Sequence, residues 1–179
     1  REVLGRFLRQ AYRRPVSAAE VDGKLGLFVA ARKGGKPFLE AIKVPLTAAL
    51  ASPHFLYLAE PHPAAPGGKP APLTDHELAS RLSYFLWSAP PDAELAKLAD
   101  AGTLKTKAVL AAQVDRMLAA PKADALVKNF AGQWLGLREV GNNPPAPDLY
   151  PQYDRHLEAS LVAEGEACFR HILAPDRPV

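Results

Sequence analysis

Apolar residues recur at the spacing of helix faces, in short segments that proline, glycine and capping residues separate. The chain opens with Val3, Leu4, Phe7 and Leu8, and intervals of three and four residues place side chains on one side of an α-helix. Pro15 closes this segment, because the residue before a proline avoids helical backbone angles. No segment shows the alternation of apolar and polar residues that a half-buried strand requires. The pattern therefore predicts an all-α fold.

Two capping boxes predict where helices begin. Ser17 stands three residues before Glu20, and Thr74 stands three residues before Glu77, so each hydroxyl and each carboxylate can accept a backbone N–H of the other residue. Proline accounts for 18 of 179 residues, about twice its usual share, and most of it lies between the periodic segments. We expect about eight helices joined by short turns.

The same periodicity predicts which side chains face the core. Leu126, Phe130 and Trp134 follow one another at intervals of four residues and form the strongest apolar face of the chain. Trp134 is therefore expected to be a core residue, whose truncation to alanine would cost roughly 3–5 kcal/mol. The inward residues expected elsewhere are Leu39, Ile42, Leu46 and Leu50 in the third helix, and Leu78, Leu82, Phe85 and Leu86 in the helix after Thr74.

Residues 61–73 are rich in proline and glycine. This composition is typical of a linker, semi-rigid where proline dominates and flexible where two glycines are adjacent. We therefore expect an N-terminal helical unit at residues 1–60 and a C-terminal helical unit at residues 74–179. The chain begins within a helical pattern and stops just after Pro175 and Pro178, so we expect a fragment whose C-terminal unit is truncated.

Cysteine content and hydropathy exclude several classes of site. Cys168 is the only cysteine, so the chain has no internal disulfide, no paired-cysteine metal site and no Cys-x-x-Cys-His motif for covalent haem attachment. Its position on an apolar helix face predicts a buried, inert thiol. No stretch approaches 18 consecutive apolar residues, so no membrane span is predicted.

The net charge of +3 is unevenly distributed. Through Glu60 there are ten basic and five acidic residues, and the excess comes largely from Arg6, Arg9, Arg13 and Arg14. Four arginines at helical spacing could meet phosphate, an anionic lipid surface or an acidic partner domain. A solvated helix face whose basic end complements the helix dipole is the favoured interpretation, because no nucleic-acid-binding motif accompanies these residues. Nucleic acid is not an expected partner.

Four residues are candidates for an interaction site: Arg81, Tyr84, Trp87 and Trp134. The aromatic rings could stack on a sugar or relay an electron, although aromatic residues at helical spacing more often belong to the core, with the indole N–H bonded to the backbone. Arg81 stands among apolar residues and would need a carboxylate partner if partly buried, and Glu77 or a helix C-terminus would serve.

Histidines and acidic residues offer weaker candidates. Glu164 and His171 are seven residues apart and share a helix face, but a metal site needs three or four converging ligands, so surface ion pairing is the favoured interpretation. His54 and His62 flank the linker and could act as axial ligands to the haem of a neighbouring domain. Loop histidines without a role are the favoured alternative.

Several sequence segments together resemble one family. In their order along the chain they resemble the planctomycete-type multidomain proteins of unknown function, which are often linked to a c-type cytochrome domain. The segments are FLRQAYRRP at 7–15, SPHFLY at 52–57, LASRLSYFLW at 78–87, RML at 116–118 and FAGQWL at 130–135.

This resemblance implies a non-catalytic scaffold or interaction module of a larger exported, cytochrome c-linked protein. It implies an extracytoplasmic location, in the periplasm or at the cell surface, with other domains of the same polypeptide as partners. Haem c would be carried by a neighbouring domain, and no cofactor is expected in this chain. The alternative is part of an extracytoplasmic enzyme that acts on polysaccharide, with carboxylates and an exposed Trp87 or Trp134 lining a groove. The sequence contains no recognisable catalytic constellation and assigns no reaction.

Overall fold

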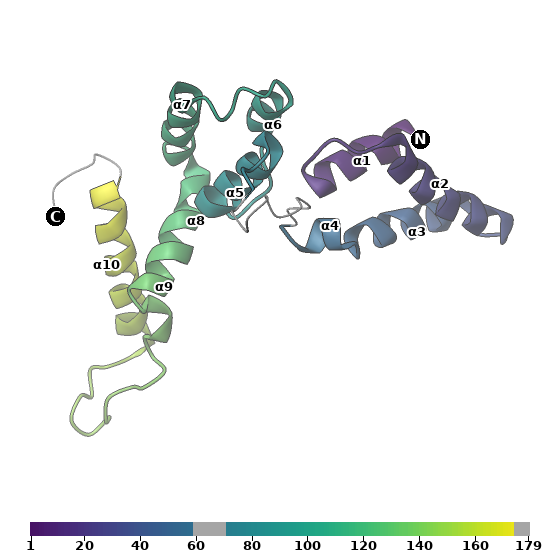
Figure 1. The fold of residues 1–179 in the computed structure, drawn as a ribbon. Coiled ribbons are helices and arrows are strands. Elements are labelled where there is room, and N and C mark those ends of the chain that lie inside the picture. Colours follow the sequence, from purple (N-terminus) through teal and green to yellow (C-terminus); the bar gives the residue numbers. More distant parts are fainter. Residues whose placement is uncertain (59–70, 174–179) are drawn as a thin grey trace. The chain divides into compact units, whose positions relative to one another are not determined.

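The computed structural model describes residues 1–58 and 71–173. Within these ranges it contains helices and connecting turns and no strand, which confirms the predicted all-α fold (Figure 1). Most of the predicted linker at 61–73 lies outside the described residues, as do His62, Pro175 and Pro178.

The chain forms two compact units that interleave in sequence. The first comprises Arg1–Ser83 with Pro90–Val109, and the second comprises Tyr84–Ala89 with Leu110–Val179. These limits differ from the linker-based division at residues 60 and 74, which stays a prediction.

The first unit begins with three helices that pack together and a short fourth one (Figure 1). The unit also holds most of a fifth helix and the whole of a sixth. Their bounds are α1 Glu2–Tyr12, α2 Ala18–Lys33, α3 Phe38–Leu50, α4 Pro53–Leu56, α5 Asp75–Trp87 and α6 Ala93–Asp100.

Both predicted capping boxes are confirmed. At the start of α2 the Glu20 N–H donates to Ser17 Oγ at 3.2 Å, and the Ser17 N–H donates to Glu20 Oε2 at 2.8 Å. At the start of α5 the Glu77 N–H donates to Thr74 Oγ1 at 3.2 Å, and the Thr74 N–H donates to Glu77 Oε2 at 2.7 Å. Each box satisfies backbone donors that the first helical turn leaves unpaired.

Buried residues of α1, α2 and α3 form one core cluster of the first unit. Its members are Leu4, Leu8, Tyr12, Val21 and Ala49, with Phe7, Ala11, Val16, Leu25, Ile42 and Leu46 packed against them.

The inward face predicted for α3 is partly wrong. Ala41, Pro45 and Ala49, at intervals of four residues, are buried, whereas Leu39 is 71% exposed and Leu50 is 42% exposed. Small side chains on a helix face allow a neighbouring backbone to approach closely, so α3 turns its alanine and proline stripe toward the core. Periodicity alone cannot distinguish this stripe from the leucine stripe beside it.

The second unit is built around a helical segment that is interrupted by wider and tighter turns. α10 packs against this segment, with contacts to η2 and η3 (Figure 1). The bounds are α7 Lys107–Leu118, of which residues 107–109 belong to the first unit, η1 Pro121–Ala123, α8 Asp124–Leu126, η2 Val127–Ala131, α9 Gly132–Trp134, η3 Leu137–Glu139 and α10 Arg155–Leu173.

The helix turn η2 is a π-helix, and it changes which residues face the core. A π-helix bonds residues five apart and so contains more residues per turn than an α-helix. Accordingly Leu126 and Ala131 are buried, as are Val127 and Gly132, each pair five residues apart. Trp134 is 67% exposed. The prediction that Trp134 is a core residue is therefore wrong, because it assumed an uninterrupted α-helical period.

Candidate functional site

Trp87 is a core residue of the second unit. Its side chain is 6% exposed, and its indole Nε1–H donates to the carbonyl oxygen of Met117 at 2.9 Å. Two cations face the same ring, with the Arg116 guanidinium carbon 5.6 Å and Lys122 Nζ 4.9 Å from the centroid. A buried indole whose only donor is bonded contributes to packing and has no open face for a sugar.

Three exposed aromatic rings and the half-buried ring of Phe169 form a cluster in the second unit. Phe130 stands at its centre, with ring centroids 6.3 Å from Phe85, 5.8 Å from Trp134 and 6.0 Å from Phe169. Exposed fractions are 59% for Phe85, 43% for Phe130 and 67% for Trp134, and the adjacent Leu135 is 48% exposed. We call these five residues the aromatic surface. The inward position expected for Phe85 is wrong.

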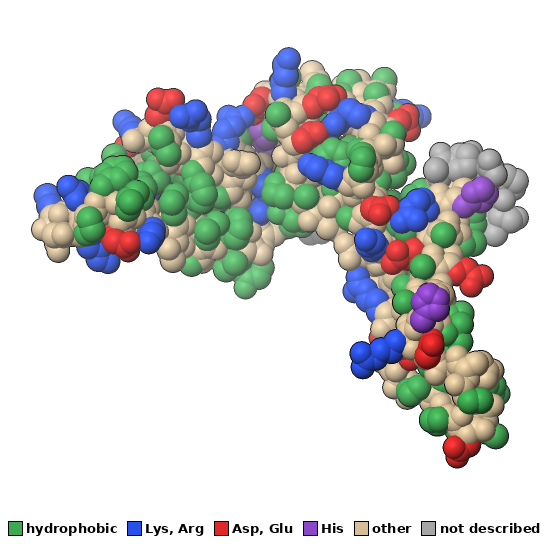
Figure 2. All heavy atoms as spheres, turned by 180° about the vertical axis from the view of Figure 1, so that it is seen from behind, with side chains coloured by type: hydrophobic (Ala, Val, Ile, Leu, Met, Phe, Trp, Pro, Cys, Tyr) green, Lys and Arg blue, Asp and Glu red, His purple; other side chains and the backbone are tan. Residues whose placement is uncertain are grey.

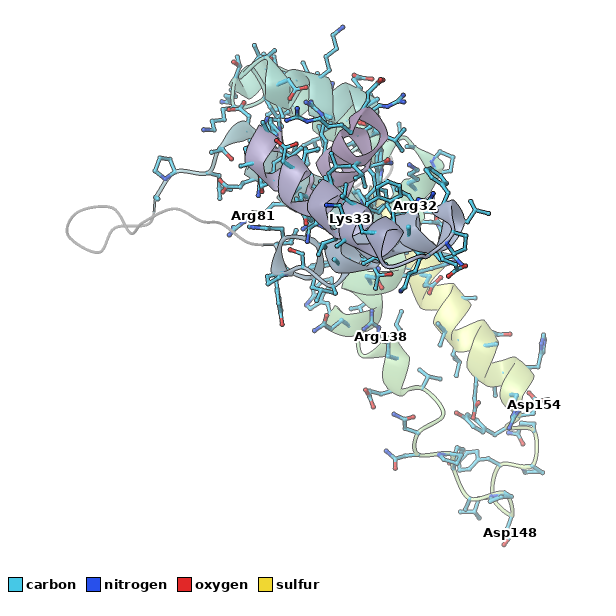
Figure 3. The ribbon with its side chains drawn as sticks, turned by 90° about the vertical axis from the view of Figure 1, so that its right-hand side faces the viewer. Arg32, Lys33, Arg81, Arg138, Asp148 and Asp154 are labelled. Carbon is cyan, nitrogen blue, oxygen red and sulfur yellow. The ribbon has the colours of Figure 1, made fainter. Side chains whose placement is uncertain are left out.

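A short polar network lies beside this surface. Asn129 Nδ2 donates to Ser88 Oγ at 2.7 Å, and Arg138 Nη2 donates to Asn129 Oδ1 at 3.0 Å. Figure 3 shows Arg138 on the segment that carries η2 and α9. Apolar rings next to a bonded amide and an arginine are the usual composition of a protein contact surface.

The remaining sequence candidates occupy varied environments. Arg81 is exposed on α5 (Figure 3), and Tyr84 is half-buried. The His54 ring packs on the Tyr12 ring at 5.3 Å between centroids. Cys168 is exposed, so the prediction of a buried thiol is wrong, because only one side of α10 packs against the rest of the unit.

Within residues 1–58 and 71–173, no three His, Cys, Asp or Glu side chains are grouped as metal ligands. In the same part of the chain, no helix combines the length and hydropathy needed to cross a bilayer.

The arginines of α1 are engaged with partners, and the interpretation as a solvated helix face is wrong for the last two. Arg13 Nη2 donates to the carbonyl oxygens of His54 and Tyr57 at 2.9 and 2.8 Å. Arg14 Nη2 lies 2.7 Å from Glu20 Oε1, and this hydrogen bond, together with those from the Ser17 N–H and hydroxyl, lowers the pKa of Glu20 from 4.5 to about 2. Both guanidinium groups are half-buried. They tie the end of α1 to the start of α2 and to the carbonyl groups of α4 and of the residue that follows it.

A second apolar surface lies on the first unit. Figure 2 shows hydrophobic side chains gathered over the part formed by α1 to α4. Among the most exposed are Phe38 at 59%, Leu39 at 71%, Leu56 at 59% and Tyr57 at 66%. Large contiguous apolar surfaces are uncommon on isolated soluble proteins and usually mark contacts.

Comparison with protein families gives two adjacent matches. Residues 1–60 match the model of PSD5, a protein of unknown function (DUF1595), and residues 73–179 match that of PSD4, a protein of unknown function (DUF1592). Searches of curated proteins and of solved structures found no match. The PSD4 model covers more than half of the residues of this chain, and the chain therefore belongs to the PSD4 family of proteins of unknown function (DUF1592).

Proposed function

We propose that this chain is a non-catalytic interaction module of a larger exported, cytochrome c-linked protein, and that its aromatic surface contacts another domain of the same polypeptide. The observation that carries the proposal is the cluster of Phe85, Phe130 and Trp134, whose side chains are 43–67% exposed while their rings contact one another. Covering such a cluster with a partner lowers the free energy, because apolar surface is removed from water.

A partner that covers the aromatic surface would remove apolar area from water. Burying apolar area contributes about 25 cal/mol per Å², and tryptophan is among the residues that most often dominate the binding energy of an interface. Trp134 is held against Phe130 before any partner arrives. Its rotamer freedom is therefore already reduced, which lowers the entropy cost of binding.

The multidomain context supports a partner in the same polypeptide. Two family modules follow one another in this chain, and the sequence resembles proteins in which such modules accompany a c-type cytochrome domain. With Cys168 as its only cysteine, this chain lacks the cysteine pair that covalent haem attachment requires. In the proposal, haem c belongs to a neighbouring domain, and the protein works outside the cytoplasm.

The two tryptophans provide the experiment. In Trp87→Phe, Trp134 is the only fluorophore of its kind, and in the isolated chain its emission should be that of a hydrated indole, readily quenched by acrylamide. In the complete polypeptide, the part of this emission that disappears when Trp134 is also replaced by phenylalanine should lie at shorter wavelength and resist quenching. The matched control, Trp134→Phe, reports on buried Trp87 and should behave alike in both contexts.

Two outcomes would count against the proposal. Equal quenching of Trp134 in the isolated chain and in the complete polypeptide would show that no domain covers the aromatic surface. A saturable shift of Trp134 emission with added oligosaccharide would favour the alternative of a polysaccharide-acting enzyme, which the exposure of this ring permits.

A further inference from the structure

A cavity of about 280 Å³ lies within the first unit, apart from the aromatic surface. Arg6, Arg9, Arg13 and Arg14 line it from α1 and the turn that follows, His76 lines it from α5, and Asp92 lines it at the start of α6. The cavity thus gathers four guanidinium groups from one short segment around a single lining carboxylate.

Three of the four arginines are held in place by the fold. Arg13 donates to backbone carbonyls of α4 and the residue after it, and Arg14 is paired with Glu20. Arg9 forms an ion pair with Asp100, whose other carboxylate oxygen lies 3.4 Å from the His76 ring. Side chains that are already ordered lose little further entropy when a ligand binds.

The fourth arginine is free to turn toward a ligand. Arg6 Nη2 lies 3.5 Å from Glu2, and the two side chains are 75% and 85% exposed. An exposed pair of this kind contributes little stability and exchanges readily. Within the described residues, the ion pairs of Arg6 and of Arg9 each use one terminal nitrogen, Nη2. A guanidinium has five N–H donors, so donors remain for a ligand.

The lining carboxylate is already engaged. Asp92 Oδ1 accepts the Leu95 N–H at 2.9 Å and caps the start of α6. The positive charge of the lining arginines is partly offset by their ion-pair partners, Glu2, Asp100 and Glu20. A ligand would therefore bind to guanidinium N–H groups that these carboxylates leave unused. Such a ligand must itself carry several negatively charged oxygens.

We propose that this arginine-lined cavity binds a compact oxyanion with at least two negative charges. The planar guanidinium matches carboxylate and phosphate oxygens through paired hydrogen bonds, and the volume lies near the lower limit of small-molecule sites. Pro91, Ala93 and Ala96 supply an apolar wall beside the arginines, which would accommodate a short carbon skeleton. Phosphate-type and carboxylate-type ligands share this chemistry.

The test is isothermal titration calorimetry of the chain with pyrophosphate and, separately, with citrate. Sodium chloride at matched ionic strength and the monoanion acetate serve as controls. We expect saturable one-site binding of at least one multivalent anion and none of acetate. A stronger response to pyrophosphate identifies a phosphate-type ligand, and a stronger response to citrate identifies a polycarboxylate. The absence of saturable heat with both probes would overturn the proposal.

Charge-matched variants locate the binding. Arg9→Gln should weaken binding about tenfold, because a hydrogen bond from a charged group is lost. Arg6→Gln should also weaken binding. Because Arg6 is exposed and its ion pair is weak, this variant tests the same cavity without disturbing the fold. Arg1→Gln is the control, since Arg1 forms a comparable ion pair with Asp22 at 2.8 Å but does not line the cavity. Equal weakening in Arg1→Gln and Arg9→Gln would show that net charge alone is sensed and would refute the site.

Discussion

Replacing Trp87 by alanine should destabilise the second unit severely. The ring is 6% exposed, so truncation removes a fully packed aromatic side chain, which costs roughly 3–5 kcal/mol. It also leaves the carbonyl oxygen of Met117 without the indole N–H that donates to it, and an orphaned buried acceptor costs about 1–3 kcal/mol. Allowing for overlap between these terms, we expect a loss of about 4–6 kcal/mol. A domain has only about 5–15 kcal/mol of stability.

Urea denaturation followed by circular dichroism measures this loss, and two further variants dissect it. Trp87→Phe keeps an aromatic ring and loses the hydrogen bond, so it should cost about 1–3 kcal/mol. Trp134→Ala removes the same number of atoms from a side chain that is 67% exposed, and it should cost less than about 1 kcal/mol. A loss in Trp134→Ala as large as that in Trp87→Ala would refute the assignment of Trp87 to the core and Trp134 to the surface.

Four other substitutions test local features by the same denaturation assay. Thr74→Ala should lower the free energy of unfolding by about 1 kcal/mol, as loss of an N-cap does, and an unchanged midpoint would contradict the capping role. The pKa of Glu20 is lowered to about 2, mainly by its hydrogen bond from Arg14 and also by those from Ser17, so the stability that these contacts provide is present above pH 4.5 and is lost as the pH falls toward 2. Glu20→Gln should therefore show a shallower loss of stability between pH 5 and pH 2 than the unmodified chain, and equal slopes would argue against the pair. Gly23→Ala should add about 1 kcal/mol, because Gly23 lies inside α2 with open space at its Cβ position. Gly141→Ala should instead destabilise by about 1–2 kcal/mol, because Gly141 has φ +88° and its Cβ position lies 3.0 Å from the Glu158 carboxylate, and a gain there would refute the strain.

Local chemistry made several features of the fold predictable. Helix starts at Ser17 and Thr74 follow from side chains that bond to backbone donors three residues away, and that geometry is complete within four residues. The end of α1 follows from Pro15 and needs no distant contact. The all-α class follows in the same way, because helical periodicity is a property of each segment.

Which face of each helix is buried depended on the tertiary structure. The segment from Leu126 to Trp134 has one apolar period in sequence, but the π-helix η2 buries residues five apart and leaves Trp134 at the surface. In α3 the alanine and proline stripe, including Pro45, is the buried one, and it leaves Leu39 and Leu50 exposed.

The candidate sites were likewise only partly visible in the sequence. The arginines of α1 could be named from their spacing, and two tryptophans could be named as alternatives for core or surface. The cavity requires α5 and α6 beside α1, and the aromatic surface requires Phe169 of α10 beside Phe130. Periodicity indicates that a helix has an apolar side. Which side is buried depends on the shape and hydrogen bonding of segments that are distant in the sequence.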